Sequence, residues 1–358
     1  MSAVEETKIV RVIKSVQSNN QINHSVEMTI SEFKTALNTW GQRKVPFLFW
    51  IDFELEKPMA VKLDQVDSRR ILFEINGFTN TKPRFLNNLP LPRERAGVRG
   101  LKKKPISLSD YKSKFNKVLY HLNYGDSFLT NLTVKTEIEI DQSLQDLFHI
   151  SNAKYKLLVK DQFLVFSPET FIQIQGGKIY SYPMKGTIDA AIPGASEIIL
   201  NNVKEKAEHV TIVDLIRNDL SMVAEDVHVS RFRYLDEITT SHKNLLQVSS
   251  EIVGTLPSDH QSTLGDILIS LLPAGSVSGA PKPKTLEIIA NTEQEKRGYY
   301  TGVVGYFNGE KLDCGVMIRF IEQTGNRYFY RSGGGITTQS DAEQEYEEMI
   351  DKVYVPID

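Results

Sequence analysis

The stretch FLVFSPETFIQIQGGKIYSYP, residues 163–183, decides the fold class of this chain. Its apolar-rich runs flank Gly176-Gly177, and a two-residue glycine turn between such runs is typical of a tight β-hairpin. Positions in a hairpin pair symmetrically about the turn, so Glu169 is expected opposite Met184. Glu169 and Lys185 would then emerge at the same end of the hairpin, within reach of each other.

The rest of the chain mixes helical patterns with hairpins. Strands joined by hairpins rather than by helical crossovers favour an α+β class with antiparallel sheets. The buried-looking run VPFLFWIDF predicts a strand within 45–53. A second hairpin is expected at Asn308-Gly309, followed by a strand that ends near Arg319. Helices are expected over 107–124 and around 196–217, 262–272, 284–296 and 340–353.

Composition bounds the class of protein. The 358 residues are 41% hydrophobic and 24% charged. The net charge is −3, so the chain has no overall positive potential that would attract nucleic acid or an anionic membrane. No apolar run approaches the ~20 residues of a membrane helix, and a cytoplasmic protein is expected. The single cysteine, Cys314, excludes an internal disulfide and is expected to be a buried, inert thiol. We divide the chain into an N-terminal α/β region, 1–105, integrated with a main domain, 106–358.

The ion pair that Glu169 and Lys185 would make has two interpretations. Strict alternation along the strand places the two side chains on opposite faces of the sheet. Pro183 and a turn at Gly186 could break that alternation. On spacing alone, an idle surface pair worth under ~1 kcal/mol is the simpler interpretation. A functional pair is the alternative.

Two further carboxylate pairs lie on expected helices. Glu205 and Glu208 stand three residues apart, and so do Glu345 and Glu348, so each pair shares a helix face. If the two helices meet, Mg²⁺ is the natural partner, because it prefers hard oxygen ligands and keeps waters and substrate oxygens in its shell. Two solvated charged faces are the alternative.

Two glycine-containing stretches follow no nucleotide-binding motif. RSGGGITTQS, 331–340, is not G-x-G-x-x-G, and SGAPKPKT, 278–285, lacks the Gly-Lys-Ser/Thr of a P-loop. Both remain open as carboxylate-binding turns or as ordinary tight turns. Arg319 could supply a bidentate clamp for the same anion.

Eight motifs in a fixed order carry a resemblance to a known family. They are FSPETF, PMKGT, KAEHVTIVDLIRNDLSMV, PAGSVSGAPKPKT, RGYYTGVVGYFNG, MIRF, GGGI and EQEYEEMIDK. Their order and spacing from about residue 105 to the end resemble the chorismate-utilising enzymes, which include the large components of anthranilate, isochorismate and aminodeoxychorismate synthases. The resemblance implies antiparallel β-sheets packed face to face with helices outside.

The resemblance also implies a ligand set for chorismate, which is a dianion. Mg²⁺, held by Glu208 and Glu348 with Glu205 and Glu345 beside them, would grip the ring carboxylate. A cationic clamp would hold the enolpyruvyl carboxylate. The substrate-binding residues implied are Thr187, Gln247, Ser278, Tyr300, Arg319, Gly333, Gly335 and Lys352. Gln247 stands where many relatives carry histidine, and a glutamine amide still hydrogen-bonds a substrate oxygen.

Lys185 resembles the lysine of the aminodeoxychorismate synthase branch, where anthranilate synthases carry alanine. By that resemblance Lys185 attacks C2 of chorismate while Glu169 protonates the departing C4 hydroxyl, and ammonia then gives 4-amino-4-deoxychorismate on the folate branch. Such a lysine needs a lowered pKa and such a glutamic acid a raised one. The alternatives are an anthranilate synthase large component or a non-catalytic chorismate-binding protein.

The source of ammonia follows from the cysteine count. A glutaminase needs a cysteine nucleophile with a histidine base, and Cys314 lies within a strand-like run. The chain is therefore expected to use free ammonia or ammonia from a separate glutamine amidotransferase subunit, and the resemblance favours the second.

Overall fold

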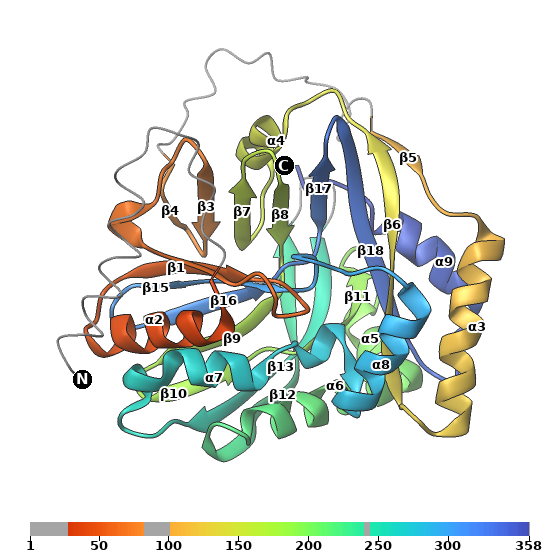
Figure 1. Ribbon diagram of the computed structural model, residues 1–358. Helices are drawn as coiled ribbons and strands as arrows, with labels where there is room; N and C mark the ends of the chain where they lie inside the picture. The colour runs from red at the N-terminus through yellow and green to blue at the C-terminus, as the bar shows by residue number, and fades with distance from the viewer. Residues whose placement is uncertain (1–27, 82–100, 240–243, 358) are drawn as a thin grey trace.

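Two antiparallel sheets form the frame of the molecule (Figure 1). The computed structural model describes residues 28–81, 101–239 and 244–357. Within these ranges each sheet has nine strands, and every strand pair is antiparallel. The expected α+β class is therefore confirmed.

The first sheet runs in the order β11-β13-β10-β9-β16-β15-β1-β2, with β12 also paired to β13. Its strands are β1 (Phe47–Ile51), β2 (Met59–Lys62), β9 (Thr170–Gln175), β10 (Lys178–Ser181), β11 (Met184–Asp189), β12 (Glu225–Thr239), β13 (Asn244–Thr255), β15 (Val303–Phe307) and β16 (Leu312–Val316).

The second sheet runs in the order β14-β6-β18-β17-β8-β7-β3-β4, with β5 also paired to β6. Its strands are β3 (Ile71–Ile75), β4 (Phe78–Thr79), β5 (Lys102–Lys104), β6 (Leu129–Glu139), β7 (Tyr155–Val159), β8 (Phe163–Ser167), β14 (Gly279–Ala280), β17 (Phe320–Thr324) and β18 (Arg327–Ile336).

Helices cover the outer faces of both sheets. They are α2 (Ile30–Gln42), α3 (Leu108–Tyr124), α4 (Leu144–Ile150), α5 (Ala195–Asn201), α6 (Val203–Leu220), α7 (Leu264–Leu271), α8 (Lys282–Glu293) and α9 (Ala342–Asp351), with short 3₁₀ turns η1 (Leu63–Gln65), η2 (His260–Thr263) and η3 (Gly275–Val277). Across the described ranges, no helix combines the length and the apolar character needed to span a bilayer.

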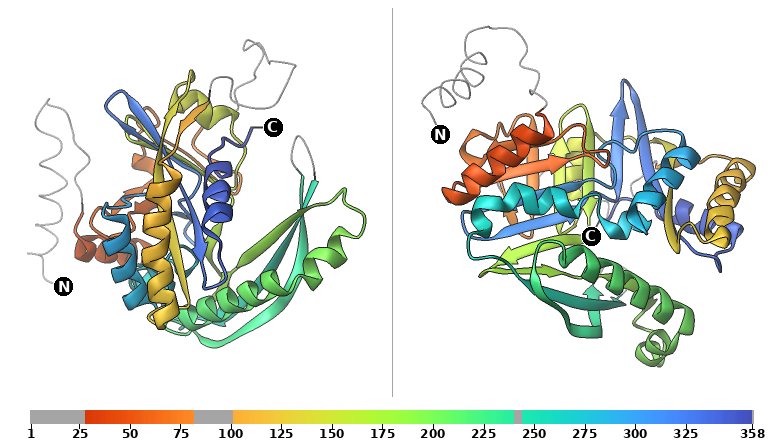
Figure 2. Two further views of the ribbon diagram at one scale, coloured as in Figure 1. Left: turned by 90° about the vertical axis from the view of Figure 1, so that its right-hand side faces the viewer. Right: turned by 60° about the horizontal axis from the view of Figure 1, so that its bottom comes forward.

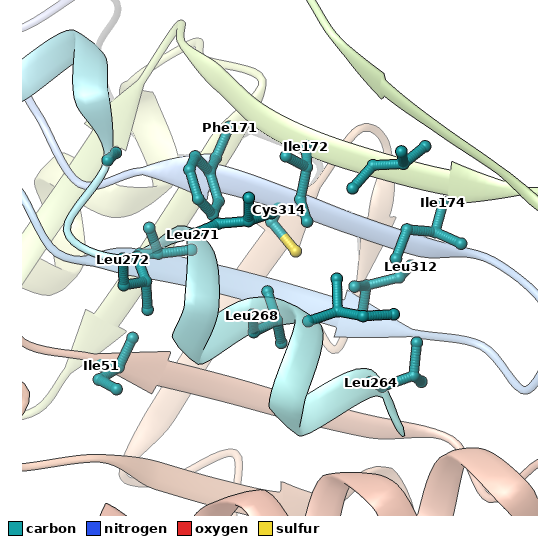
Figure 3. Packing of buried hydrophobic residues seen from close by; sticks show 14 of the residues in the cluster. Ile51, Phe171, Ile172, Ile174, Leu264, Leu268, Leu271, Leu272, Leu312 and Cys314 are labelled. Atoms are coloured by element: carbon teal, nitrogen blue, oxygen red, sulfur yellow. The ribbon is translucent and has the colours of Figure 1, made fainter. Parts of the chain in front are cut away.

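The inner faces of the two sheets share one apolar layer. Trp50 of β1 and Val304 of β15 pack in a single buried cluster with Phe73 of β3 and Leu157 of β7. Because these side chains come from both sheets, the expected face-to-face packing is confirmed. The outer face of the first sheet packs on α2 and α7, and Figure 3 shows Leu268 of α7 close to Cys314 of β16.

The outer helices of the second sheet follow from simple sequence signals. Helix α3 begins after Ser107, whose hydroxyl accepts from the N–H of Asp110, and ends at Gly125 with φ of +88°. Its buried face includes Phe115 and Val118, which pack on β6 and β18 together with α9. Cys314 is fully buried, which confirms that part of the expectation, and burial raises the pKa of its thiol, which disfavours the reactive thiolate.

The glycine hairpin forms, but its ladder is shorter than expected. Gln175 pairs with Lys178 across Gly176-Gly177, both with positive φ, which confirms the turn. The expected pairing of Glu169 with Met184 is wrong. The ladder between β9 and β10 ends at the pair of Gln173 with Tyr180, and Met184 continues the pairing of β10 with β13, opposite Ser249.

Three other expectations need correction. The helix expected around 196–217 is two helices, because the Asn202 side chain caps α6 by accepting from the N–H of Glu205. The strand expected to end near Arg319 ends at Val316, and Arg319 follows it with φ of +55°. The residues Gly333–Gly335 belong to strand β18 rather than to a turn, and they pair with β6.

The described part of the N-terminal region, 28–81, contributes β1 and β2 to the first sheet and β3 and β4 to the second. The boundary between 1–105 and 106–358 stays a prediction, since residues 1–27 and 82–100 lie outside the described ranges.

A buried ion pair ties β6, α8 and η3 together. Arg297 Nη2 lies 2.7 Å from Glu293 Oε1, and both side chains are almost fully buried. Arg297 also donates to the backbone oxygens of Val277 and Asn131, at 2.7 and 2.8 Å. Glu293 accepts from the N–H of Thr133 on β6. The pair therefore sets the spacing between α8, η3 and β6.

Arg297→Met is expected to lower the free energy of unfolding by about 3–5 kcal/mol, because it leaves the Glu293 carboxylate buried without its partner. Urea denaturation measures the change. The matched control is Lys296→Met, which removes an exposed ion pair with Glu56 and is expected to cost less than ~1 kcal/mol. Equal losses in the two variants would contradict the structural role of the buried pair.

Candidate active site

A cavity of about 320 Å³ lies where the two sheets meet. One wall is a face of α6 that includes Glu208 and Thr211, and β9 to β11 form another. Leu129 of β6 and Gly335 of β18 bring the second sheet into the lining. In Figure 2, α5 and α6 lie along the extension formed by β11, β12 and β13. Both Glu169 and Lys185 line this cavity, although they do not pair in the hairpin.

Lys185 reaches the cavity from β11 and meets α6. Its Nζ lies 2.7 Å from Glu208 Oε2, and its side chain is 36% exposed. Gly186 follows with φ of +88°, and a Cβ there would stand 3.1 Å from Glu205 Oε2. The glycine after Lys185 therefore provides both the turn and the room for a second carboxylate.

The pKa of Lys185 is raised in this structure. Burial favours the neutral amine, but the carboxylates of Glu208, Glu205 and Glu348 together outweigh it. This direction is opposite to the lowered pKa that a lysine nucleophile needs. Neutralising or binding the surrounding carboxylates would therefore favour the neutral amine.

Glu169 sits at the end of the loop that precedes β9. Ser276 Oγ donates to Glu169 Oε1 at 2.5 Å. Burial raises the pKa of Glu169, against the opposing effects of the Ser276 hydrogen bond, Arg319 and Lys352. A raised pKa is the direction that a general acid requires near neutral pH.

The four glutamates come from the two helices that the sequence singled out. Lys185 influences the pKa of Glu345 and Glu348 on α9 as well as contacting Glu208 on α6, so the two helices face the same lysine. Burial raises the pKa of Glu345. The pKa of Glu348 is lowered, since Lys352 and Lys185 outweigh its partial burial.

Two observations bear on whether these glutamates can hold a divalent cation. Among the described residues, no three carboxylate, imidazole or thiol groups gather closely enough to form a complete metal cage. Glu205 Oε2, however, is buried without a hydrogen-bond partner, and a buried anionic oxygen calls for a cation. Mg²⁺ commonly takes one or two carboxylates and keeps several waters. The donor set therefore fits such an ion.

A cationic region adjoins Glu169. Arg319 and Lys352 both act on the pKa of Glu169, and Tyr300, Tyr330 and Arg319 influence one another. Arg319 Nε is buried with no hydrogen-bond partner. Lys352 Nζ donates to the backbone oxygen of Gly333 and lies 2.7 Å from Glu348. A guanidinium whose buried Nε has no partner is suited to an anionic ligand.

The remaining predicted site residues lie in different places. Thr187 and Gln247 pair across β11 and β13, and neither lines the cavity. Ser278 is fully buried and donates to Ala274 O, away from the cavity lining. Tyr300 is 4% exposed in the layer between the sheets. Gly335 does line the cavity.

Sequence reasoning missed Ser276. Its hydroxyl contacts Glu169, whereas Ser278 was singled out from the same motif. Ser276 and Ser278 stand two positions apart in one motif, and nothing in the sequence favours one over the other. Only the three-dimensional path of η3 shows that Ser276 contacts Glu169.

Comparisons with known proteins show which family the chain belongs to. The model of the chorismate binding enzyme family matches residues 15–358. A Haemophilus influenzae protein named as an uncharacterized PabA-like protein is 48% identical over 332 residues, covering 93% of this chain and 98% of that protein. Aminodeoxychorismate synthase component 1 of Salmonella typhimurium is 32% identical over 260 residues, covering 68% of this chain and 56% of the relative.

A solved structure is also similar to this chain. Anthranilate synthase component I of Streptococcus pneumoniae matches with a TM-score of 0.63 and 28% identity, covering 74% of this chain and 62% of that one. The chain thus spans little more than half of the length of these functionally named relatives. The family match extends over nearly the whole sequence, and the chain belongs to the chorismate-utilising enzymes.

Proposed function

We propose that this protein is the large component of an aminodeoxychorismate synthase, converting chorismate and ammonia to 4-amino-4-deoxychorismate. The observation that carries the proposal is the presence of Lys185 and Glu169 on the wall of one cavity. Relatives named aminodeoxychorismate synthase component 1 support it at about 30% identity.

The chemistry divides between these two side chains. The Lys185 amine forms a bond to C2 of the ring, the diene electrons shift, and the C4–O bond breaks. Glu169 gives its proton to the departing hydroxyl, which leaves as water. Ammonia then forms a bond at C4, the electrons shift back, and the bond between C2 and the lysine nitrogen breaks. The added nitrogen gives up one proton, which restores the acid form of Glu169. Glu169 suits its role because burial raises its pKa.

The two carboxylates of chorismate have complementary surroundings. Arg319, with its unused buried Nε, and Lys352 provide positive charge for one carboxylate. Glu208, Glu348, Glu205 and Glu345 are proposed to hold Mg²⁺, which would neutralise these carboxylates and grip the ring carboxylate. The same neutralisation would remove the interactions that now raise the pKa of Lys185.

The proposal leaves the supply of ammonia to another chain. Cys314 is fully buried and its thiol pKa is raised, so it is not an activated thiolate. We propose a separate glutamine amidotransferase as the source, consistent with relatives named component 1.

A second candidate is anthranilate synthase activity. It is favoured by the structural likeness to Streptococcus pneumoniae anthranilate synthase component I and by a 36% identical Archaeoglobus fulgidus relative of that name. The two reactions differ in one product, because anthranilate formation releases pyruvate. Incubation with chorismate, ammonia and Mg²⁺, followed by chromatography, identifies the product.

Lys185→Ala is expected to lower 4-amino-4-deoxychorismate formation at least roughly 100-fold, because the covalent step loses its nucleophile. Chorismate should still bind, since its carboxylates keep their partners. Chromatography follows the product and calorimetry follows binding. Lys206→Ala, an exposed lysine on α6, is the matched control and should keep wild-type rates. Undiminished product formation by Lys185→Ala would refute the nucleophile.

Glu208→Gln and Glu348→Gln are each expected to weaken Mg²⁺ binding roughly 10-fold or more, because each removes an anionic oxygen donor. The measurement is the rise in thermal midpoint with Mg²⁺ concentration, which needs no turnover. Glu347→Gln, the exposed neighbour on α9, is the control and should respond to Mg²⁺ like the wild type. Identical Mg²⁺ responses in all variants would remove these glutamates from the metal site.

Glu169→Gln is expected to become more stable relative to the wild type as pH rises above about 4.5. The pKa of Glu169 is raised in the folded protein, so the unfolded chain loses that proton first and folding becomes less favourable. The difference grows by up to ~1.4 kcal/mol per pH unit until the folded pKa is reached. Urea unfolding from pH 4 to 8 tests it, and a difference independent of pH would contradict it.

A further inference from the structure

We propose that Ser276 is a positioning residue that decides which oxygen of Glu169 carries the acid proton. The inference deepens the proposed function and rests on the role of Glu169 in it. Ser276 Oγ donates to Glu169 Oε1 at 2.5 Å. A hydroxyl has one proton to donate, so Oε1 serves as the acceptor. The acid proton is thereby directed to Oε2, the other oxygen.

The loop that carries Ser276 is held firmly on both sides of the serine. Arg297 Nη1 donates to Val277 O at 2.7 Å, and the N–H of Asn131 donates to Ser278 O at 2.8 Å. Ser278 Oγ closes the turn by donating to Ala274 O. The hydroxyl of Ser276 is therefore presented to Glu169 by a backbone fixed to β6 and to the buried ion pair.

Helix α6 supports the same loop from the other side. A Cβ on Gly275 would lie 2.9 Å from Asp219 Oδ2 and 3.1 Å from Leu215, so the backbone of η3 packs directly on the helix. Helix α6 also carries Glu208, the partner of Lys185. Helix α6 thus packs against the turn that carries Ser276 and also carries the glutamate that contacts Lys185.

Ser276 acts on Glu169 differently from the charged groups that face this carboxyl group. Arg319, between β16 and β17, and Lys352, at the end of α9, act on Glu169 through their charge. Charge stabilises the carboxylate without choosing between its oxygens at hydrogen-bond range, whereas the Ser276 hydrogen bond is directed at one of them. Orientation of the carboxyl group is therefore assigned to Ser276.

The experiment compares Ser276→Ala, Ser276→Thr and Ser127→Ala in the full chain. Ser127 is the matched control, because its hydroxyl is buried and lies within hydrogen-bond distance of Ala280 O and Leu129 O rather than of Glu169. The first readout is the ¹³C NMR titration of the Glu169 carboxyl, assigned with Glu169→Gln. The second is the pH dependence of kcat and KM with chorismate, ammonia and Mg²⁺.

Ser276→Ala is expected to move the Glu169 midpoint upward by roughly one pH unit, because a donor to the charged form is lost. The high-pH limb of kcat should shift in the same direction, with kcat lowered roughly 10-fold at neutral pH and KM within about twofold. Ser276→Thr should restore both readouts, and Ser127→Ala should change neither.

An unshifted Glu169 midpoint in Ser276→Ala would overturn the proposal. So would a loss of kcat in Ser276→Ala with no movement of the high-pH limb, since that result marks a merely structural serine. Absence of chorismate turnover in the wild type would instead overturn the proposed function, and the NMR comparison would still decide whether Ser276 acts on Glu169.

Discussion

The buried ion pair between Arg297 and Glu293 is the constraint on which the site depends. It joins α8 to β6 through Thr133 and to η3 through Val277. Taking two charges out of water is costly, and the attraction between them repays that cost only with good geometry and further hydrogen bonds. Here both side chains have several such bonds. The pair thus contributes a fixed geometry at the edge of the cavity, where η3 presents Ser276 to Glu169.

The electrostatics of the site are organised around Lys185. Carboxylates on α6 and α9 face it, while Arg319 and Lys352 influence Glu169. Two neighbouring groups of opposite charge suit a ligand with two separate anionic groups and a reactive ring between them. In the state described, Glu208 is satisfied by Lys185 itself. A cation that bound these carboxylates would replace Lys185 in this ion pair. The carboxylates would therefore keep the amine charged before the cation binds and favour the neutral amine afterwards.

Local patterns in the sequence predicted local structure well. The glycine turn, the capped helix α3, the buried run of β1 and the buried Cys314 all follow from short-range rules. The path of β11 could not be predicted, because it continues the pairing of β10 with β13, whose Ser249 lies more than sixty residues away from Met184. The split between α5 and α6 depends on one asparagine cap. Ser276 was missed because its importance comes only from the long-range placement of η3.

The departure of β11 from the hairpin changes how the two proposed reacting groups are held. Two side chains on one hairpin would move as a unit. Instead, Glu169 precedes β9, which pairs with β16, while Lys185 is on β11, whose partner is β13. Because β10 and the start of β11 pair with β13 in one register, β13 holds the segment that joins the hairpin to Lys185. The position of Lys185 relative to Glu169 therefore depends on β13 as well as on the hairpin.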